Sequence, residues 1–472
     1  MRTNLVTLGV LGTLFAGCSS GPVAPDLAAI YNDAAQSIGD ARTPVVVIPG
    51  ILGSKLEEPS SRIPVWGAFV YGAADADTPE GARLVALPMH ESVPLRDLLD
   101  EVAPTDVLDR LKVDTLGFVR GVEFDAYVNI MRTLAAGKYR DPDLTEPGEI
   151  DYAGAHYTCF QHAYDWRRDI AESAAALDGR IREAQAAARS ARGLPDGAPM
   201  RVDVVAHSMG GLVLRYYLRY GAQPLPEDGS LPSLTWAGAT NVSNAILVGT
   251  PSAGSALSLE QLVHGKDLNP IAPNFRPAVL GTMPAVYQLL PRARHHAVID
   301  ADSGEPIDLF DPAVWERYGW GLADPDQDVY LRWLLPEADS REDRRRIALE
   351  HLTKCLARAE QTHRALDVPA TPPPGTRLSL YAGDGVDTPA VYAVDARGRI
   401  RLAESAPGDG TVSRTSALMD ERVGSAYAPG LRSPIAWDRV QFCFTNHIGL
   451  TRDPAFVDNV LYTLLEEPRT AR

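Results

Sequence analysis

Residues 204–211 read Val-Val-Ala-His-Ser-Met-Gly-Gly and join the end of an apolar strand, a serine and the start of a helix. A serine on so tight a turn needs small residues two positions before and after it, because strand and helix nearly touch there. Ala206 and Gly210 meet this need, with alanine in place of the usual first glycine of Gly-x-Ser-x-Gly. The pattern predicts a nucleophilic Ser208, and an ordinary strand–helix turn is the alternative.

Short apolar runs alternate with helical patterns on both sides of this turn. The run Pro44 to Ile48 is apolar and β-branched, as expected of a strand buried on both faces of a parallel sheet. This alternation predicts an α/β fold with a doubly wound, mostly parallel sheet. The other expected strands are 201–206, 245–248, 377–381 and 439–444, and the expected helices are 123–136, 169–192, 211–220 and 454–465.

Two long stretches interrupt the alternation. Residues 54–120 and 252–375 far exceed the 2–6 residues of ordinary strand–helix loops, so we expect insertions that stand over the strand ends. The expected core is therefore discontinuous. It comprises residues 42–53, 121–251 and 376–466.

The N-terminus has the features of an export signal. Arg2 precedes an uncharged run, Leu5 to Phe15, that is shorter than the roughly 20 residues of a membrane-spanning helix. With small residues before Cys18, residues 1–17 resemble a bacterial lipoprotein signal peptide. The resemblance implies cleavage before Cys18, a lipid on that cysteine and a tether over residues 18–41. The protein is then an exported, membrane-anchored lipoprotein of the periplasmic face, outer membrane or cell surface; the alternative is an ordinary secretory signal.

Charge and cysteine content narrow the function further. The 472 residues include 45 basic and 61 acidic side chains, and the net charge of −16 disfavours nucleic-acid binding. The same charge argues against a polybasic membrane tether, which leaves the lipid anchor as the link to a membrane surface. Cys159, Cys355 and Cys443 fit no zinc spacing. They allow one disulfide and one free thiol, or none, so their pairing stays open.

A serine nucleophile needs a base and an acid, which follow it in the order Ser, Asp/Glu, His in this kind of sheet. His447 comes directly after the last expected strand, where the base belongs. Two Gly-Asp-Gly turns offer the acid. Position after a strand favours Asp384, whereas an expected hairpin between the turns leaves room for Asp409. The residues alone leave this choice open.

Seven ordered motifs point to a known family. Together they resemble the lecithin:cholesterol acyltransferase family, which also contains lysosomal phospholipase A2 and phospholipid:diacylglycerol acyltransferases. The resemblance runs from about residue 44 to 465, with an α/β-hydrolase fold as the implied architecture. The motifs are PVVVIPGILGSKLEE (44–58), YDWR (164–167), AHSMGG (206–211), LVGTPSAGS (247–255), LYAGDGVDTPAVY (380–392), GDGTV (408–412) and NHIGL (446–450).

The resemblance implies roles for individual residues. The family's catalytic acid lies in the GDGTV element, which is Asp409 here, and the element that holds Asp384 is not catalytic in the family. The backbone amides of Ile51 and Met209 are implied as the oxyanion hole. This agrees with the general logic of the fold, which takes one donor from the residue after the nucleophile. Asp165-Trp166-Arg167 is interpreted as structural.

Residues 54–80 correspond to the family's lid and membrane-binding region, and 252–375 to a cap insertion. Trp66 and Phe69 could form an interfacial wedge that takes up a lipid chain. The alternative is that both side chains pack under the cap.

These inferences predict a serine enzyme that acts on lipid acyl esters, as a hydrolase or an acyltransferase. Its expected substrate is a phospholipid or another acyl-ester lipid, and the Ser208–Asp409–His447 chemistry requires no metal and no cofactor. An amidase or thioesterase could use the same residues. A catalytically inactive lipid-binding lipoprotein and a surface adhesin or scaffold are the remaining alternatives.

Overall fold

The computed structural model describes residues 25–36, 42–69, 73–108, 110–113, 122–125, 127–141, 157–266, 274–424 and 428–468. The expected signal peptide and Cys18 lie outside these residues. Within the expected tether, two short helices are described, α1 (Leu27–Ile30) and α2 (Asn32–Gln36). Tyr31 between them is buried, and its hydroxyl donates to the Asp458 carboxylate at 2.7 Å. This stretch is therefore docked on the body of the protein.

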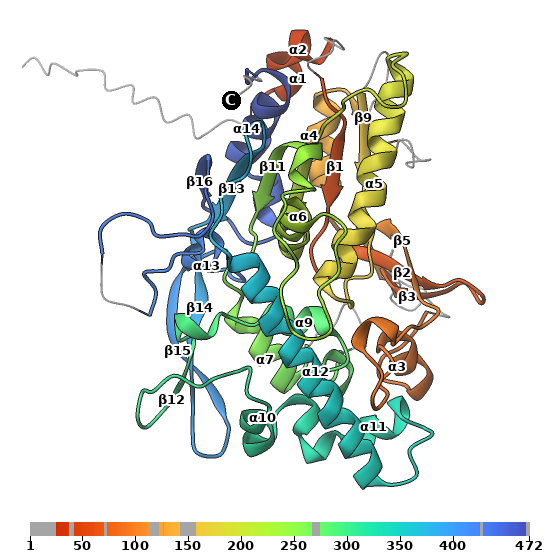
Figure 1. Ribbon diagram of the computed structural model, residues 1–472, viewed down its shortest axis with the longest axis vertical. Coiled ribbons are helices and arrows are strands. Elements are labelled where there is room, and N and C mark those ends of the chain that lie inside the picture. Colours follow the sequence, from red (N-terminus) through yellow and green to blue (C-terminus); the bar gives the residue numbers. More distant parts are fainter. Residues whose placement is uncertain are drawn as a thin grey trace, which may run out of the picture.

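A seven-stranded sheet forms the centre of the molecule, and every strand pair in it is parallel (Figure 1). The predicted α/β class with a mostly parallel sheet is confirmed. Five strands were expected; β8 and β9 are additional, and Tyr-Thr-Cys-Phe-Gln of β9 lacks the apolar run by which the others were found. In spatial order the strands are β16 (Arg439–Cys443), β13 (Arg377–Gly383), β11 (Val242–Val248), β10 (Val202–His207), β1 (Val45–Ile48), β9 (Tyr157–Gln161) and β8 (Tyr139–Arg140).

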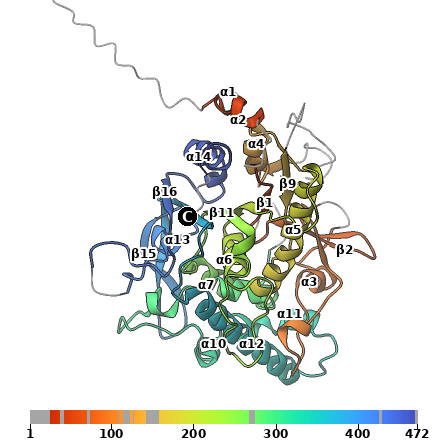
Figure 2. The same cartoon turned by 45° about the horizontal axis from the view of Figure 1, so that its top comes forward.

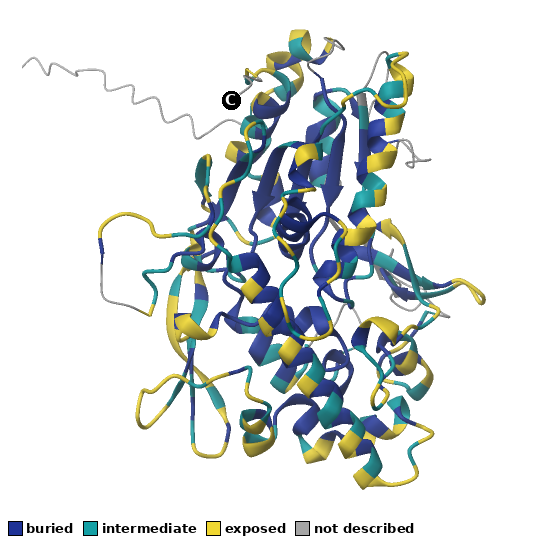
Figure 3. Ribbon diagram, viewed as in Figure 1, coloured by how far each residue is buried: buried dark blue, intermediate teal, exposed yellow. Residues whose placement is uncertain are grey.

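Helices cover both faces of this sheet. Helices α5 (Ile170–Ala191) and α6 (Met209–Tyr220) pack on one face, and α4 (Val128–Ala136) and α14 (Pro454–Leu465) on the other. Side chains alternate along β1 between the two hydrophobic clusters, and all four are fully buried, which explains the unbroken apolar run (Figure 3). Burying each such side chain contributes about 1.5–3 kcal/mol.

Two expectations about local structure need correction. The helix predicted over 123–136 covers only 128–136, because Val122-Glu-Phe-Asp alternates with a strand period and forms β7 (Val122–Asp125). The hairpin expected from the short runs 391–394 and 399–403 is longer than those runs. It consists of β14 (Val386–Val394) and β15 (Ile400–Gly408), which pair antiparallel.

The two long stretches between core elements form layers of their own. In Figures 1 and 2, the helices of 252–375 lie beyond the carboxyl ends of the central strands, and α3 lies beside them. Between 54 and 120 the elements are β2 (Ser54–Glu58), β3 (Ile63–Trp66), β4 (Ala68–Phe69), α3 (Pro79–Val85), β5 (Ala103–Val107) and β6 (Arg110–Val113). From 252 onward they are α7 (Ala256–His264), α8 (Pro277–Leu280), α9 (Pro284–Gln288), β12 (Val298–Asp300), α10 (Pro312–Tyr318), α11 (Asp328–Leu334) and α12 (Arg341–Asp367), and α13 (Arg414–Leu418) follows β15.

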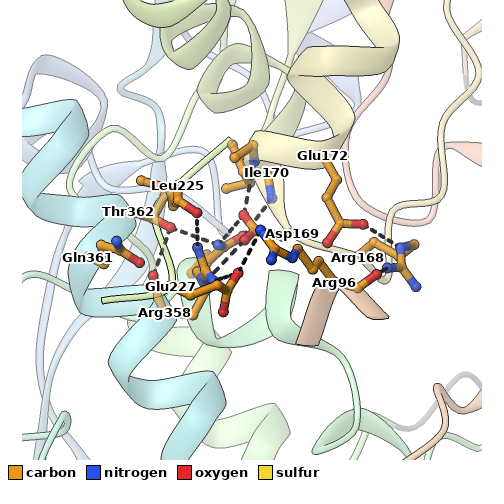
Figure 4. A network of polar contacts seen from close by, with 12 residues as sticks. Arg96, Arg168, Asp169, Ile170, Glu172, Leu225, Glu227, Arg358, Gln361 and Thr362 are labelled. Carbon is orange, nitrogen blue, oxygen red and sulfur yellow. Dashed lines mark hydrogen bonds and ion pairs between the residues drawn. The ribbon is translucent and has the colours of Figure 1, made fainter. Parts of the chain in front are cut away.

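A buried polar network fastens the long helix α12 to the core (Figure 4). Arg358 of α12 lies 3.5 Å from the carboxylate of Asp169, the residue that caps α5, and 2.8 Å from Glu227. The amide of Gln288 on α9 donates to Asp169 and to the Thr362 hydroxyl, both at 2.8 Å. Glu227 is at the exposed edge of this network, and the other four side chains are buried. Because the buried groups satisfy one another away from water, the network fixes the cap helices relative to the sheet.

In the described part of the chain, no helix is both long and apolar enough to cross a bilayer.

Candidate active site

Ser208 occupies the turn between β10 and α6 with a strained backbone. Its φ and ψ are 54° and −128°, a conformation that a residue with a side chain rarely adopts. Such strain costs about 1–3 kcal/mol and persists only where the surroundings enforce it. Here the Ser208 N–H donates to the Val248 carbonyl at 2.8 Å. A Cβ on Gly210 would overlap the Pro49 carbonyl, which explains the small residue required two positions after the serine.

The structure brings Ser208, His447 and Asp409 together in one hydrogen-bonded line. The Ser208 hydroxyl lies 2.9 Å from Nε2 of His447, and Nδ1 of the same ring lies 2.8 Å from Asp409 Oδ2. Ser208 follows β10, Asp409 follows β15 and His447 follows β16, so three separate chain segments converge here. A further bond from the His447 N–H to the Asp409 carbonyl, at 2.9 Å, ties the last two segments directly.

The surroundings of Asp409 keep its carboxyl group ionised. Burial disfavours the charge, but the hydrogen bond to His447 and the amides of Thr411 and Val412, at 2.9 and 2.7 Å, outweigh it and lower the pKa of Asp409. An ionised carboxylate can only accept, so Nδ1–H of His447 donates to it. The Nε2 lone pair then faces Ser208 and accepts from its hydroxyl, which is the arrangement a general base needs.

The second candidate acid lies elsewhere. Asp384, in the other Gly-Asp-Gly turn, pairs with the Arg414 guanidinium at 2.5 Å. Of the two candidates, it is therefore Asp409 that meets His447, in agreement with the role implied by the family resemblance.

Two residues that the sequence analysis did not single out support His447 from the other side. Nε2–H of His207 donates to the His447 carbonyl at 3.1 Å, because a carbonyl can only accept. Its Nδ1 is then an acceptor for the Tyr127 hydroxyl at 3.0 Å, and Tyr127 Oη accepts from the Gly50 N–H at 2.7 Å. Burial lowers the pKa of His207 to about 3, so this ring is neutral. The only sequence signal was a histidine directly before the nucleophile.

The same chain of bonds touches the expected oxyanion hole. In the loop after β1, the Gly50 N–H already donates to the Tyr127 hydroxyl, so it is not the oxyanion donor. The following residue of the loop is Ile51, which lines the cavity together with Ser208. Met209 is the first residue of α6, and the amides of a first helical turn have no partner within the helix. The two predicted donors thus come from the loop after β1 and from the first turn of α6.

A cavity of about 350 Å³ opens on Ser208 and His447. Trp66 forms part of its wall: it is 5% exposed, its indole N–H donates to the Leu52 carbonyl at 2.7 Å, and its ring packs 5.5 Å from that of Phe275. Of the two interpretations of Trp66, this structure matches packing under the cap. The side chain of Phe69 lies outside the described parts.

Arg167 ties the insertion over residues 54–120 to the core, in keeping with its structural interpretation. Its buried guanidinium forms ion pairs with Asp165 at 2.7 Å and Asp100 at 2.9 Å. It also donates to the carbonyls of Leu84 and Val85.

The pairing left open for Cys159, Cys355 and Cys443 is resolved, since all three are free and buried. Among the described residues, no group of three His, Cys, Asp or Glu side chains could hold a metal ion.

Comparison with known proteins identifies a similar sequence family and similar folds. The lecithin:cholesterol acyltransferase family model matches residues 152–324, which include Ser208 and end before Asp409, so the resemblance drawn from the motifs is confirmed over that part. No curated protein is significantly similar in sequence. In the Tle4–Tli4 complex, a crystal structure, one chain is 17% identical with a TM-score of 0.54, over 91% of this chain and 99% of that one, which shows a common fold.

Two further solved structures are similar at lower scores. Lipase 1 from Pelosinus fermentans is 13% identical with a TM-score of 0.35, over 90% of this chain and 99% of that chain. EstA from Clostridium botulinum is 12% identical with a TM-score of 0.34, over 92% and 89%. The fold of this chain is that of the α/β-hydrolases, as its parallel sheet and the serine between β10 and α6 indicate.

Proposed function

We propose that this protein is a serine enzyme of the lecithin:cholesterol acyltransferase type that takes an acyl group from an acyl-ester lipid, such as a phospholipid. The observation that carries the proposal is the hydrogen-bonded line Ser208–His447–Asp409 at the mouth of a largely apolar cavity. The match of the family model around Ser208 supports it.

The geometry supports a two-step acyl transfer. Ser208 Oγ attacks the ester carbonyl while His447 Nε2 takes its proton, and Asp409 stabilises the imidazolium that forms. The amides of Ile51 and Met209 bind the oxyanion, and loss of one such donor costs about 10²–10³ in rate. When the carbon–oxygen ester bond breaks, the leaving alkoxide receives the proton from His447. Water or an alcohol then attacks the acyl-enzyme while His447 Nε2 takes its proton. The bond between the acyl carbon and Ser208 Oγ breaks, and His447 returns the proton to Oγ, which restores the free serine and the neutral imidazole.

The cavity lining favours an acyl chain. Leu52, Leu108, Val286 and Leu289 provide apolar surface next to the serine. A hydrocarbon chain that packs on this lining gains about 0.8 kcal/mol for each methylene that it buries. We further propose that the protein is exported and anchored by a lipid on Cys18, which brings this cavity close to a membrane.

Removal of the Ser208 hydroxyl tests the proposal. We expect Ser208→Ala to fold normally, to lose labelling by a fluorophosphonate probe and to lose turnover of a dihexanoyl glycerolipid by about 10⁴-fold or more. Ser230→Ala, which removes an exposed serine hydroxyl, is the matched control and should behave as wild type.

The outcome also separates the alternatives. A wild-type protein that hydrolyses only amide or thioester members of a substrate panel is an amidase or thioesterase. Absence of fluorophosphonate labelling in folded wild-type protein indicates an inactive lipid-binding lipoprotein. Turnover that persists in Ser208→Ala contradicts the proposed mechanism.

A further inference from the structure

A lysine side chain lines the cavity that holds the proposed nucleophile. Lys266 lies two residues beyond the end of α7 and faces the same cavity as Ser208. Its backbone is fixed by a pair of hydrogen bonds with Phe275, at 2.8 and 3.0 Å, whose ring packs on Trp66. The base of this lysine side chain is therefore held rigidly against the cavity wall.

The Lys266 ammonium has no partner among the described residues. The residue is partly buried, and within the described ranges its ammonium forms no hydrogen bond, ion pair or ring contact. Lys354 on α12 shows the usual situation, because its ammonium reaches two backbone carbonyls at 2.9 Å and Glu350 at 3.4 Å. Burial lowers the pKa of Lys266, because it removes water from the charged form.

The other described residues that line the cavity provide no carboxylate to pair with Lys266. The described residues that line it include no aspartate or glutamate, and Asp409 lies behind His447 rather than on the cavity surface. An unpaired charge away from water is costly until an opposite charge joins it.

We propose that Lys266 is an anion subsite of the substrate cavity and binds an anionic group carried by the acyl-ester substrate, such as the phosphodiester of a glycerophospholipid. The inference rests on the proposed function, because the ester must lie at Ser208 while its anionic group lies at Lys266. A neutral acylglycerol presents the same ester without the group that pairs with the ammonium. Lys266 then determines specificity between charged and neutral esters.

A matched pair of monomeric substrates tests this subsite. Dihexanoyl phosphatidylglycerol and dihexanoylglycerol, both below their critical micelle concentrations, carry the same acyl esters and differ in the phosphodiester. We expect wild type to favour the anionic substrate in kcat/KM. Lys266→Met should lower kcat/KM for the phospholipid by about 10–100-fold, as expected for a lost charge-assisted hydrogen bond, and change it for dihexanoylglycerol by less than about threefold. Lys266→Arg should restore most of the preference.

Controls separate the failure of this inference from that of the proposed function. Arg397→Gln removes an exposed positive charge from the loop between β14 and β15 and should leave the substrate ratio unchanged. Equal losses for both substrates in Lys266→Met, or an unchanged ratio, overturn the subsite. If the variant alters only inhibition by added hexanoate, the cation binds the released carboxylate and the inference is wrong. If wild type cleaves neither ester and Ser208 is not labelled, the proposed function itself fails.

Discussion

The two Gly-Asp-Gly turns have the same local sequence and different surroundings. Asp409, at the end of β15, is 1% exposed and is bonded to His447 and to two backbone amides. Asp384, at the end of β13, forms an ion pair with Arg414, whose side chain is 44% exposed. The turns also touch, because a Cβ on Gly383 would overlap the Asp409 side chain. Tertiary contact, rather than the tripeptide, therefore separates a residue that can orient a base from one that pairs at the surface.

Removal of the charge from Asp409 should have the largest effect. An asparagine can present its NH₂ group to Nδ1 of His447, which favours the wrong tautomer. We expect Asp409→Asn to lower kcat for ester turnover by about 10³–10⁴-fold with the fold retained. Steady-state kinetics with circular dichroism as the folding control measure this. A loss below tenfold would show that the Asp409 carboxylate does not orient His447.

A methyl group on the first turn should disturb the second. Gly383→Ala places a Cβ where Asp409 stands, so the carboxylate must shift away from His447. A displacement of about 1 Å at a reacting group can cost about 100-fold in rate, and we expect a loss of that order. Gly385→Ala is no substitute control, because its Cβ would meet Phe444. Gly398→Ala, in the distant loop between β14 and β15, is a suitable control. This variant should be less stable to unfolding, without a comparable loss in kcat per folded molecule.

A further test asks whether Asp409 alone holds His447 in place. His207→Gln retains an amide that can reach the His447 carbonyl, whereas His207→Asn retains only an acceptor for Tyr127. If the bond to His447 matters, kcat should fall by about tenfold more in the asparagine variant than in the glutamine variant. KM should change little in either. Equal activities would assign all orientation of His447 to the Asp409 turn.

The pH dependence of the unfolding free energy tests whether the Asp409 carboxyl group is ionised in the folded protein. Hydrogen bonds lower the pKa of folded Asp409 below its ordinary value, so its contribution to stability is complete above the unfolded pKa of about 3.9. That contribution is lost as the pH falls through the folded pKa. The difference in unfolding free energy between wild type and Asp409→Asn should therefore shrink below about pH 4, as urea titrations at pH 7, 4 and 3 can measure. A gap that widens in acid contradicts the assignment.

Asp384→Asn should have the smallest effect. The substitution breaks a partly exposed ion pair, which contributes at most about 1 kcal/mol to stability. We expect kcat/KM within about threefold of wild type and a correspondingly small change in thermal midpoint. A larger loss of turnover than in Asp409→Asn would reverse the roles of the two turns.

Much of this arrangement could be predicted from the sequence because it depends on short-range patterns. The apolar runs identify five of the seven central strands, and the residues around Ser208 identify its turn. The acid could not be chosen locally, since both turns share one tripeptide and the pairing of β14 with β15 decides which of them reaches His447. Tyr127, His207 and Lys266 were missed because their significance arises only when segments far apart in the chain meet.

The three buried thiols offer a way to watch this molecule open. Cys159 lies on β9, Cys443 on β16 and Cys355 on the long helix α12, and burial raises the pKa of each thiol. An alkylating reagent reacts with the thiolate, so modification at each position must wait for local exposure. The three alkylation rates, measured by mass spectrometry of tryptic peptides, would compare how often β9 and β16 open locally with how often the cap helix α12 does. Substrate held between sheet and cap should slow the rate at Cys355 most.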